Sequence, residues 1–477
     1  MNHKPASSLP RSLVIGRAAK FIGREGEAPA ELWRRQLGRS LALPSESQAD
    51  SLKDAPSLVA KLAKSFDFRP FLMSWRLPLY AILILCTLIG CGKSEKRPLV
   101  EGLDWPDLEA QAKGQNVRLA MWDGDPMINA YMRDFVLPKM LSLYGVKVQL
   151  IGGQGNNLVS KLMVDLETGR RAGDVDLMWI NGETFYQLRQ MKALFGPFTE
   201  RLPNSKYIDW KNPFIAFDFQ QPVEGYECPW GNVQLAIIYH TQRVAQPPEN
   251  MQVLAQWVRE HPGRFTFDNS FTGMTFLKCL LYEFAGGKGS LDGPFDQAKY
   301  EIAADKLWKY LKEIQPFMWR EGKTFPESVA QLHQLYMNNE VDFTMSNNDG
   351  EVDNKAEQGI IPSASRAYVL ETGTIRNSHY LGIPMNSPNK AAAMVLANFM
   401  ISPEAQWEKS LPKVWGDGTV LNPELLTGDW RERFESIPGR SRVPPRAQLE
   451  KNALMEPAPE IMVRLNEDFR TKIIETR

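Results

Sequence analysis

Val117–Trp122 (VRLAMW), Val146–Ile151 (VKVQLI) and Val175–Ile180 (VDLMWI) are the stretches that decide the fold of this 477-residue chain. Each is a short, mainly apolar run with β-branched or aromatic residues, which is typical of a buried strand. The segments between them, 126–144 and 157–168, have the spacing of amphipathic helices. This alternation predicts a parallel β-sheet covered by helices on both faces.

A second alternating unit occupies roughly 233–365. Its predicted strands are 233–239, 264–267 and 341–345, and its predicted helices are at about 250–260, 272–284, 297–314 and 326–338. Extended segments at 368–374 and 379–384 and a helix at 391–400 follow, whereas 195–232 is irregular. Two such units need two cores, so we expect two domains. They are lobe 1, made of 116–232 plus 373–477, and lobe 2, made of 233–372.

The run Leu77–Cys91 (LPLYAILILCTLIGC) has a shorter apolar part than a membrane-spanning helix, which needs about 20 residues. It suits the apolar region of a secretory signal peptide, and its last four residues resemble a bacterial lipobox, in which cleavage falls before a cysteine that carries lipid. We therefore expect 73–90 to be a lipoprotein signal peptide, Cys91 to be lipidated and 91–115 to be a tether. The alternative is a signal anchor that is never cut.

Residues 1–72 mix Arg, Glu, Ala, Ser and Pro with little apolar periodicity. We interpret them as a mis-assigned start or a disordered leader, because Met73 followed by Arg76 offers an alternative beginning for the signal peptide.

Composition excludes several classes of partner. Lys+Arg and Asp+Glu both number 56 and no basic run occurs after Cys91, so no nucleic-acid partner is predicted. The chain has only five His and no His/Cys cluster, so neither a metal nor a cofactor is predicted. After processing, Cys228 and Cys279 would remain. A disulfide between them is one possibility, but the apolar run around Cys279 favours a buried thiol.

Leu381–Ala393 (LGIPMNSPNKAAA), followed by Asn398–Gln406, resembles the C-terminal signature of extracellular solute-binding proteins, family 1, of ABC importers. The pieces DVDLMWINGE (174–183), PWGNVQ (229–234) and FTGMTFLK (271–278) are similar to its YnjB-like subgroup.

The resemblance covers about residues 115–410 and implies a two-lobed α/β fold of the periplasmic-binding-protein-like type II, with hinge strands and an interlobe cleft. It also implies a monomer outside the cytoplasm that works with an ABC permease and an ATPase.

Candidate solute-binding residues gather where the predicted strands end, because ligands of open α/β sheets bind outside the carboxyl ends of the strands. Aromatic rings stack, amides donate and accept, and glycine allows close approach. Helix capping and turn formation explain many of the same residues equally well. The candidates are Trp122, Gly124, Asp125, Gly153, Asn156, Trp179, Asn181, Glu183, Trp230, Phe271, Thr272, Asn347 and Asn348.

Acidic residues recur at the same strand ends: Asp123, Asp125, Glu183, Asp268 and Asp349. With the tryptophans they favour a cationic solute, although caps predict the same acids. A sensory or scaffold lipoprotein with this fold is an alternative function. An acid/base hydrolase using Asp123 and Asp125, or Asp349, is a weaker one, because no nucleophile motif accompanies these acids.

Overall fold

The computed structural model describes residues 100–153 and 155–475. The predicted leader, signal peptide and lipidated Cys91 therefore lie outside the described residues. In the described part of the chain, no helix has the length and apolar character needed to cross a membrane.

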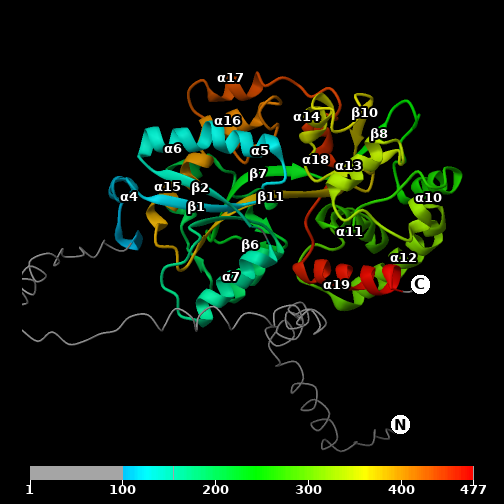
Figure 1. Cartoon of the computed structure of the whole chain (residues 1–477), viewed down its shortest axis with the longest axis horizontal. Coiled ribbons are helices and arrows are strands. Elements are labelled where there is room, and N and C mark those ends of the chain that lie inside the picture. Colours follow the sequence, from blue (N-terminus) through cyan, green and yellow to red (C-terminus); the bar gives the residue numbers. More distant parts are fainter. Residues whose placement is uncertain (1–99, 154, 476–477) are drawn as a thin grey trace, which may run out of the picture. The chain divides into compact units, whose positions relative to one another are not determined.

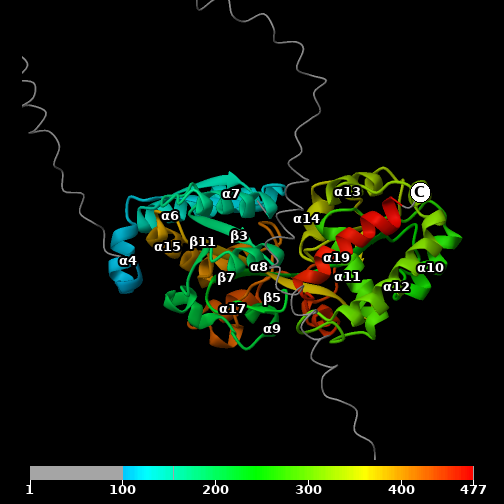
Figure 2. The same ribbon diagram turned by 90° about the horizontal axis from the view of Figure 1, so that it is seen from below.

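The sheet of lobe 1 contains the three strands that the sequence predicted. β1 (Asn116–Met121) lies between β2 (Lys147–Gly152) and β3 (Leu177–Ile180), and both pairings are parallel. The long strand β11 (Thr374–Pro384) then adds to β3 in antiparallel orientation, so the sheet is mixed (Figure 2). Three further strands pair with β11, namely β4 (Leu194–Phe195), β7 (Glu227–Gln234) and β12 (Ala453–Leu454).

The predicted helix at 126–144 forms as one run with a π-helical segment in its middle. α5 (Pro126–Ala130) continues into the π-helix Tyr131–Val136 and then into α6 (Leu137–Tyr144). Leu137 donates its backbone N–H to Met132 O, five residues earlier, as in a π-helix, and the next residue, Pro138, has no N–H to donate. The other main helices of lobe 1 are α4 (Trp105–Ala112), α7 (Asn156–Glu167), α8 (Glu183–Gln190), α15 (Lys390–Met400) and α16 (Pro403–Ser410).

Lobe 2 is built around a small antiparallel sheet. Its strand order is β10 (Ser365–Tyr368), β8 (Ala236–His240) and β9 (Phe343–Ser346). Its helices are α10 (Met251–Glu260), α11 (Phe271–Ala285), α12 (Gln297–Ile314), α13 (Val329–Met337) and α14 (Glu351–Glu357).

The predicted strand at 264–267 is wrong. The segment is buried, but Arg264 O and Phe265 O accept hydrogen bonds from Asp342 N and Trp319 N, which lie on two different segments. No continuous ladder forms because no single neighbouring strand runs beside it.

Three crossings connect the lobes. β7, which begins six residues before the predicted strand at 233, leads through Leu235 into β8. β10 leads back into β11. This strand contains the whole predicted segment 379–384 and also residues 375–378, which were predicted as a gap between two extended segments. The last crossing contains α18 (Arg446–Lys451), β12 and α19 (Pro459–Phe469).

The C-terminal helix packs on lobe 2, whereas the sequence predicts that all of 373–477 belongs to lobe 1. The apolar side chains Ile461, Leu465 and Phe469 of α19 lie in the core cluster of lobe 2. Figures 1 and 2 show α19 beside α11 and α12. The cause is the apolar stripe of α19, which is buried in the core cluster of lobe 2.

Short elements complete the described chain: 3₁₀ helices at Val100–Gly102, Thr199–Arg201, Pro203–Tyr207, Gln315–Phe317, Trp319–Gly322 and Pro423–Leu425, α9 (Pro213–Ala216), β5 (Phe217–Asp218), β6 (Gln221–Pro222), α17 (Trp430–Glu435) and a π-helix at Arg470–Ile474.

The two cysteines among the described residues are free thiols in different cores. Cys228 is buried in lobe 1 and Cys279 in lobe 2. The buried-thiol interpretation is therefore confirmed for Cys279, and the disulfide is not formed.

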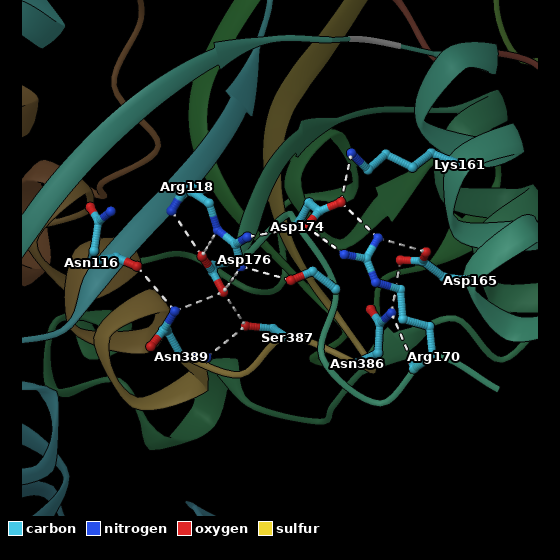
Figure 3. Close-up of polar contacts among 11 residues, drawn as sticks. Asn116, Arg118, Lys161, Asp165, Arg170, Asp174, Asp176, Asn386, Ser387 and Asn389 are labelled. Atoms are coloured by element: carbon cyan, nitrogen blue, oxygen red, sulfur yellow. Dashed lines mark hydrogen bonds and ion pairs between the residues drawn. The ribbon is translucent and has the colours of Figure 1, made fainter. Parts of the chain in front are cut away.

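The signature stretch at 381–393 has a structural role at the amino ends of the strands. The buried carboxylate of Asp176 accepts hydrogen bonds from Ser387 Oγ (3.0 Å) and Asn389 Nδ2 (3.2 Å) and pairs with Arg118 Nε (2.9 Å) (Figure 3). Asn389 also donates to Asn116 O (3.0 Å). This network ties the start of α15 to β1 and β3, at the sheet edge opposite the strand ends that carry the candidate residues.

Candidate functional site

The loop after the carboxyl end of β1 meets lobe 2 directly. Lys355 Nζ on α14 lies 3.0 Å from Asp125 Oδ2, which follows β1. Asn354 Nδ2 donates to Trp415 O (2.6 Å), and a Cβ at Gly350 would overlap Gly416 O. We call this contact the interlobe seam, formed by residues 122–125 and 415–417 of lobe 1 and 347–355 of lobe 2. The end of β3 lies next to that of β1, because the two strands pair in parallel. The strand ends of lobe 1 therefore face lobe 2, as the cleft hypothesis requires.

The loop after β1 places Trp122, Gly124 and Asp125 at the seam. Gly124 lies under the Trp122 ring, since a Cβ there would come within 2.6 Å of it. Asp125 caps α5 by accepting from Met127 N (2.8 Å) and Ile128 N (3.3 Å). Because the Asp125 carboxylate also pairs with Lys355, its charge is already balanced across the seam.

The Asp125–Lys355 contact includes a third buried group. Glu351 Oε2 lies 3.5 Å from Lys355 Nζ. Burial alone would lower the pKa of Lys355, but the Glu351 and Asp125 carboxylates outweigh burial and raise it. Lys355 is therefore a permanent positive charge that links lobe 2 to the first turn of α5.

The loop after β2 forms a tight strand-to-helix turn. Gly153 donates its N–H to Met121 O (3.3 Å) and packs beside Leu158. Gly155 has a positive φ of 54° before the first residue of α7, Asn156, whose side chain lies outside the described part. The positions of these residues agree with a turn, and solute contact by Gly153 and Asn156 stays a prediction.

The loop after β3 contains Asn181, Gly182 and Glu183. The half-buried Asn181 side chain makes no hydrogen bond to any other residue described by the structure. Glu183 begins α8 and accepts from Gln187 Nε2 (2.9 Å). Burial raises the pKa of Glu183, although Lys278 and the Gln187 hydrogen bond oppose the shift.

The candidates of lobe 2 lie at the start of α11 and the end of β9. Thr272 is buried, and its Oγ1 accepts from Asn347 Nδ2 (3.0 Å). Asn348 is buried and its Oδ1 accepts from Gly350 N (2.8 Å), as a turn-forming residue does. Phe271 remains 39% exposed at the first residue of α11, so it is the aromatic ring of this group that a solute can contact.

Trp179 and Trp230 belong to an aromatic cluster that also includes His379 and Trp415. We call these four residues the aromatic base. The Trp179 ring lies 5.0 Å from Trp230 and 4.9 Å from His379, and Trp230 lies 5.4 Å from Trp415. Three indoles and an imidazole from β3, β7, β11 and the loop after α16 thus meet in lobe 1, next to the seam, and the three indoles belong to the core cluster of that lobe.

The aromatic base contains polar atoms without partners. Trp230 Nε1 and Trp415 Nε1 are buried and make no hydrogen bond within the described residues. Asp417 Oδ1 also has no hydrogen-bond partner among the described residues and lies 3.7 Å from His379 Nε2, while Oδ2 pairs with Lys409 Nζ (2.7 Å). Burial opposes ionisation of Asp417, but Lys409 and His379 overcome it and lower its pKa. Each unpaired buried donor costs about 1–3 kcal/mol, which a bound partner would offset.

Sequence reasoning missed His379, Trp415 and Asp417. His379 lies within the predicted extended segment 379–384, and its pairing opposite Gly231 of β7 is what brings it to the cluster. Trp415 and Asp417 come from a loop in which no motif is visible, and only the chain's return over α14 brings them to the seam.

Three of the five acids that suggested a cationic solute have internal partners. Asp125 pairs with Lys355, as described above. Asp268 Oδ1 accepts from Ser270 N (3.0 Å) at the start of α11. Asp349 pairs with Arg440 Nη1 (2.6 Å) and also faces Arg446, and these cations lower its pKa despite burial. Asp123 and Glu183 form no ion pair among the residues described.

A depression of about 560 Å³ lies elsewhere, on the flank of lobe 1 around Arg189. It contains none of the predicted site residues, and Arg189 is occupied by Glu224 (2.7 Å) and by the Tyr226 ring (3.6 Å). Within 100–153 and 155–475, no group of three or more His, Cys, Asp and Glu side chains is arranged to hold a metal ion.

Solved structures share this architecture. The spermidine/putrescine ABC transporter substrate-binding protein PotD from Streptococcus pneumoniae matches 75% of this chain and 99% of its own, with a TM-score of 0.52 and 17% identity. The Atu4243-GABA receptor matches 76% and 98%, with a TM-score of 0.53 and 16% identity. AfuA from Actinobacillus pleuropneumoniae, with fructose-6-phosphate bound, matches 75% and 98%, with a TM-score of 0.52 and 14% identity. At these identities the similarity defines a class of fold, the two-lobed periplasmic binding protein.

The sequence comparisons are more specific. A model of the family described as bacterial extracellular solute-binding protein matches residues 139–430. Protein YnjB from Escherichia coli (strain K12) is 35% identical over 337 residues, which cover 70% of this chain and 86% of that protein. The chain belongs to the bacterial extracellular solute-binding proteins, which confirms the resemblance to this family and to its YnjB-like subgroup and implies a location outside the cytoplasm.

Proposed function

We propose that this protein is the lipid-anchored solute-binding component of an ABC importer, which captures a small cationic solute between its lobes by hinge closure and passes it to a permease that an ATPase drives. Family membership supports the binding role. The observation that carries the proposal is the convergence, at one seam, of strand-end loops from both lobes over an aromatic base with unpaired indole N–H groups.

The chemistry of the seam supports an organic cation that also carries an acceptor atom. Asp123 and Glu183 follow the adjacent parallel strands β1 and β3, and neither carboxylate forms an ion pair within the described residues. Indole and phenyl faces attract cations, and the Trp122 and Phe271 side chains are partly exposed. The N–H groups of Trp230 and Trp415 need an acceptor, such as a hydroxyl or carbonyl oxygen of the solute.

A thermal-shift screen of the full-length protein tests the ligand class. Putrescine, spermidine, choline and thiamine form the cationic set, and glucose and inorganic phosphate form the control set. We expect at least one cation to raise the melting temperature, because a ligand that binds only the native state stabilises it by RT ln(1 + [L]/Kd). Stabilisation by glucose or phosphate alone would refute the cationic proposal but leave solute binding intact.

Charge-neutral variants locate the site. In D123N/E183Q the shift given by the stabilising cation should disappear. The matched control is D107N, which removes an exposed acid in the first turn of α4, far from the seam, and should keep the shift. Chemical conversion of the stabilising compound during incubation would contradict a pure binding role and revive the hydrolase alternative.

The anchor is tested separately. Mass spectrometry of the membrane-extracted protein should show a diacylglycerol-modified cysteine at position 91 as the new N-terminus. C91S should move the protein to the soluble fraction, whereas the signal-anchor alternative predicts an uncut chain that stays in the membrane. A tether of this kind keeps the binding protein near its permease and raises its effective concentration there.

A further inference from the structure

The β5–β6 hairpin has an unusual turn. Only Phe219 and Gln220 separate its strands, in which Phe217 pairs with Pro222 and Asp218 with Gln221. Both turn residues have positive φ values, 46° and 61°. Two-residue turns of this hand favour Asn and Gly, and other residues keep such angles only where their surroundings impose them. Contacts of the hairpin tip, defined as Phe219 and Gln220, must therefore hold this conformation.

Those contacts are with lobe 2. Phe219 is 2% exposed and lies in the core cluster of lobe 2, with Lys278 Nζ of α11 4.7 Å from its ring centroid. Gln220 Oε1 accepts from Gly293 N (2.8 Å), in the loop between α11 and α12. Its Nε2 donates to Glu456 O (2.7 Å), in the last crossing segment. A two-residue tip from the lobe 1 side is thus embedded in lobe 2.

The base of the same hairpin holds the loop after β3. The Asp218 carboxylate accepts a hydrogen bond from the backbone N–H of Gly182. A Cβ at Gly182 would overlap the Phe219 ring, so only glycine fits there, and its φ of 50° also favours glycine. Gly182 stands between Asn181 and Glu183, two residues predicted to contact the solute.

We infer that the hairpin tip is an interlobe clasp and that Phe219 is a positioning residue for solute binding. The inference rests on the proposed function, because it concerns the hinge closure that traps the solute. The clasp joins the loop 181–183 to lobe 2, so a movement of that loop on solute contact is transmitted to the lobes. The strength of the clasp sets the ratio of closed to open protein before solute arrives, and the apparent affinity scales with the fraction of protein in the binding-competent state.

Distance measurement between spin labels tests the clasp without any solute. The labels replace Leu141 on α6 and Met337 on α13, which are 53% and 46% exposed, in a full-length chain with C86S and C91S. Cys228 and Cys279 are buried, which raises the pKa of both thiols and keeps them unreactive. Pulsed dipolar spectroscopy then gives the distribution of interlobe distances.

In F219A the short-distance population should lose weight to a longer one. The closed-to-open ratio should fall roughly tenfold to a hundredfold, as expected from losing one buried aromatic side chain. The matched control is F217A, in the same hairpin but 42% exposed, which should keep the distribution of the parent chain. Q220A removes the two tip hydrogen bonds without opening the core and should shift the distribution in the same direction by less.

An F219A distribution equal to that of the parent chain would overturn the inference. If F219A fails to fold by circular dichroism, Q220A decides: an unchanged distribution in Q220A would equally overturn it. The measurement uses no solute, so it tests the clasp even if every compound in the thermal-shift screen fails. If a compound stabilises the protein but F219A leaves the distance distribution unchanged, the clasp is rejected and the proposed function is not.

Discussion

Removing the Lys278 ammonium should destabilise the protein strongly, and more so as pH rises. Lys278 is fully buried on α11, and its Nζ lies 2.5 Å from Glu456 Oε2, whose side chain is 4% exposed. The ammonium also lies near the rings of Phe219 (4.7 Å) and Phe271 (5.3 Å). Its positive charge therefore balances Glu456 and acts on two nearby acids, Asp218 and Glu183.

The magnitude follows from burial. Replacing one partner of a buried ion pair leaves an uncompensated charge and costs about 3–5 kcal/mol. K278M keeps the volume and apolar stem of the side chain, so most of this loss is electrostatic. E456Q should cost less than K278M, because the ammonium keeps the two rings and the nearby acids. The double variant K278M/E456Q should recover most of the loss.

The pH dependence has a definite sign. Burial already raises the pKa of Asp218 and Glu183 above their ordinary values of 3.8 and 4.5, and Lys278 holds both shifts back. In K278M the two pKa values rise further. An acid whose pKa is higher in the folded state binds more protons there, so stability is lost as pH rises above the unfolded value. The difference between parent and K278M should be smallest near pH 4 and grow towards pH 8.

Urea unfolding at pH 4 and pH 8 measures both quantities. R433M is the matched control, because Arg433 pairs with Asp429 at 2.7 Å but the two side chains are 48% and 59% exposed. That variant should change the free energy of unfolding by less than about 0.5 kcal/mol. A K278M loss of similar size to R433M, or a loss that shrinks as pH rises, would refute the reasoning.

Three further substitutions test other parts of the structure. Glu227 is fully buried with both carboxylate oxygens unpaired in the described chain, and burial and Asp218 raise its pKa well above 4.5. E227Q should therefore be as stable as the parent near pH 4 and more stable at pH 8. The difference in the free energy of unfolding, measured in urea, should grow by up to about 1.4 kcal/mol per pH unit. D176N removes the partner of Arg118 and weakens two more hydrogen bonds, so calorimetry should show a lower melting temperature, equivalent to about 2 kcal/mol, with the spin-label distances unchanged. G182A should shift the interlobe distances, because its Cβ meets the Phe219 ring. G155A, with a similar φ of 54° and nothing within 4 Å, should lose only about 1 kcal/mol of stability through added backbone strain. Equal effects of the two glycine substitutions would contradict the close contact at Gly182.

Local patterns in the sequence were sufficient for most elements of the fold. β1, β2 and β3 were predicted within about two residues, and so were α10, α11 and α12, because apolar periodicity and caps act over neighbouring residues. The predicted strand at 264–267 failed for the opposite reason. Its residues have strand-like chemistry, but a strand exists only where a neighbouring strand pairs with it along its length.

The site was only partly predictable. Trp122, Trp179 and the loop 181–183 were placed at strand ends, and parallel pairing of β1 and β3 brings those ends to one edge. Trp230 was predicted just before the interlobe crossing and lies within β7. Capping accounts for Asp125, and turn formation for Asn348, as the sequence alternatives allowed. Solute contact by any of these residues stays a prediction.

The sequence by itself determined the strand–helix order of lobe 1, the positions of the strand-end loops and the family, because all three are written in short contiguous stretches. Only the tertiary structure decided which charges remain available and what surrounds Trp230. Lys355 neutralises Asp125 from 230 residues away in the chain, and His379 and Trp415 complete the aromatic base. The insertion of Phe219 into lobe 2 was likewise decided by tertiary packing. Contacts between distant segments depend on how the crossing strands position both lobes, and no local pattern in the sequence records that geometry.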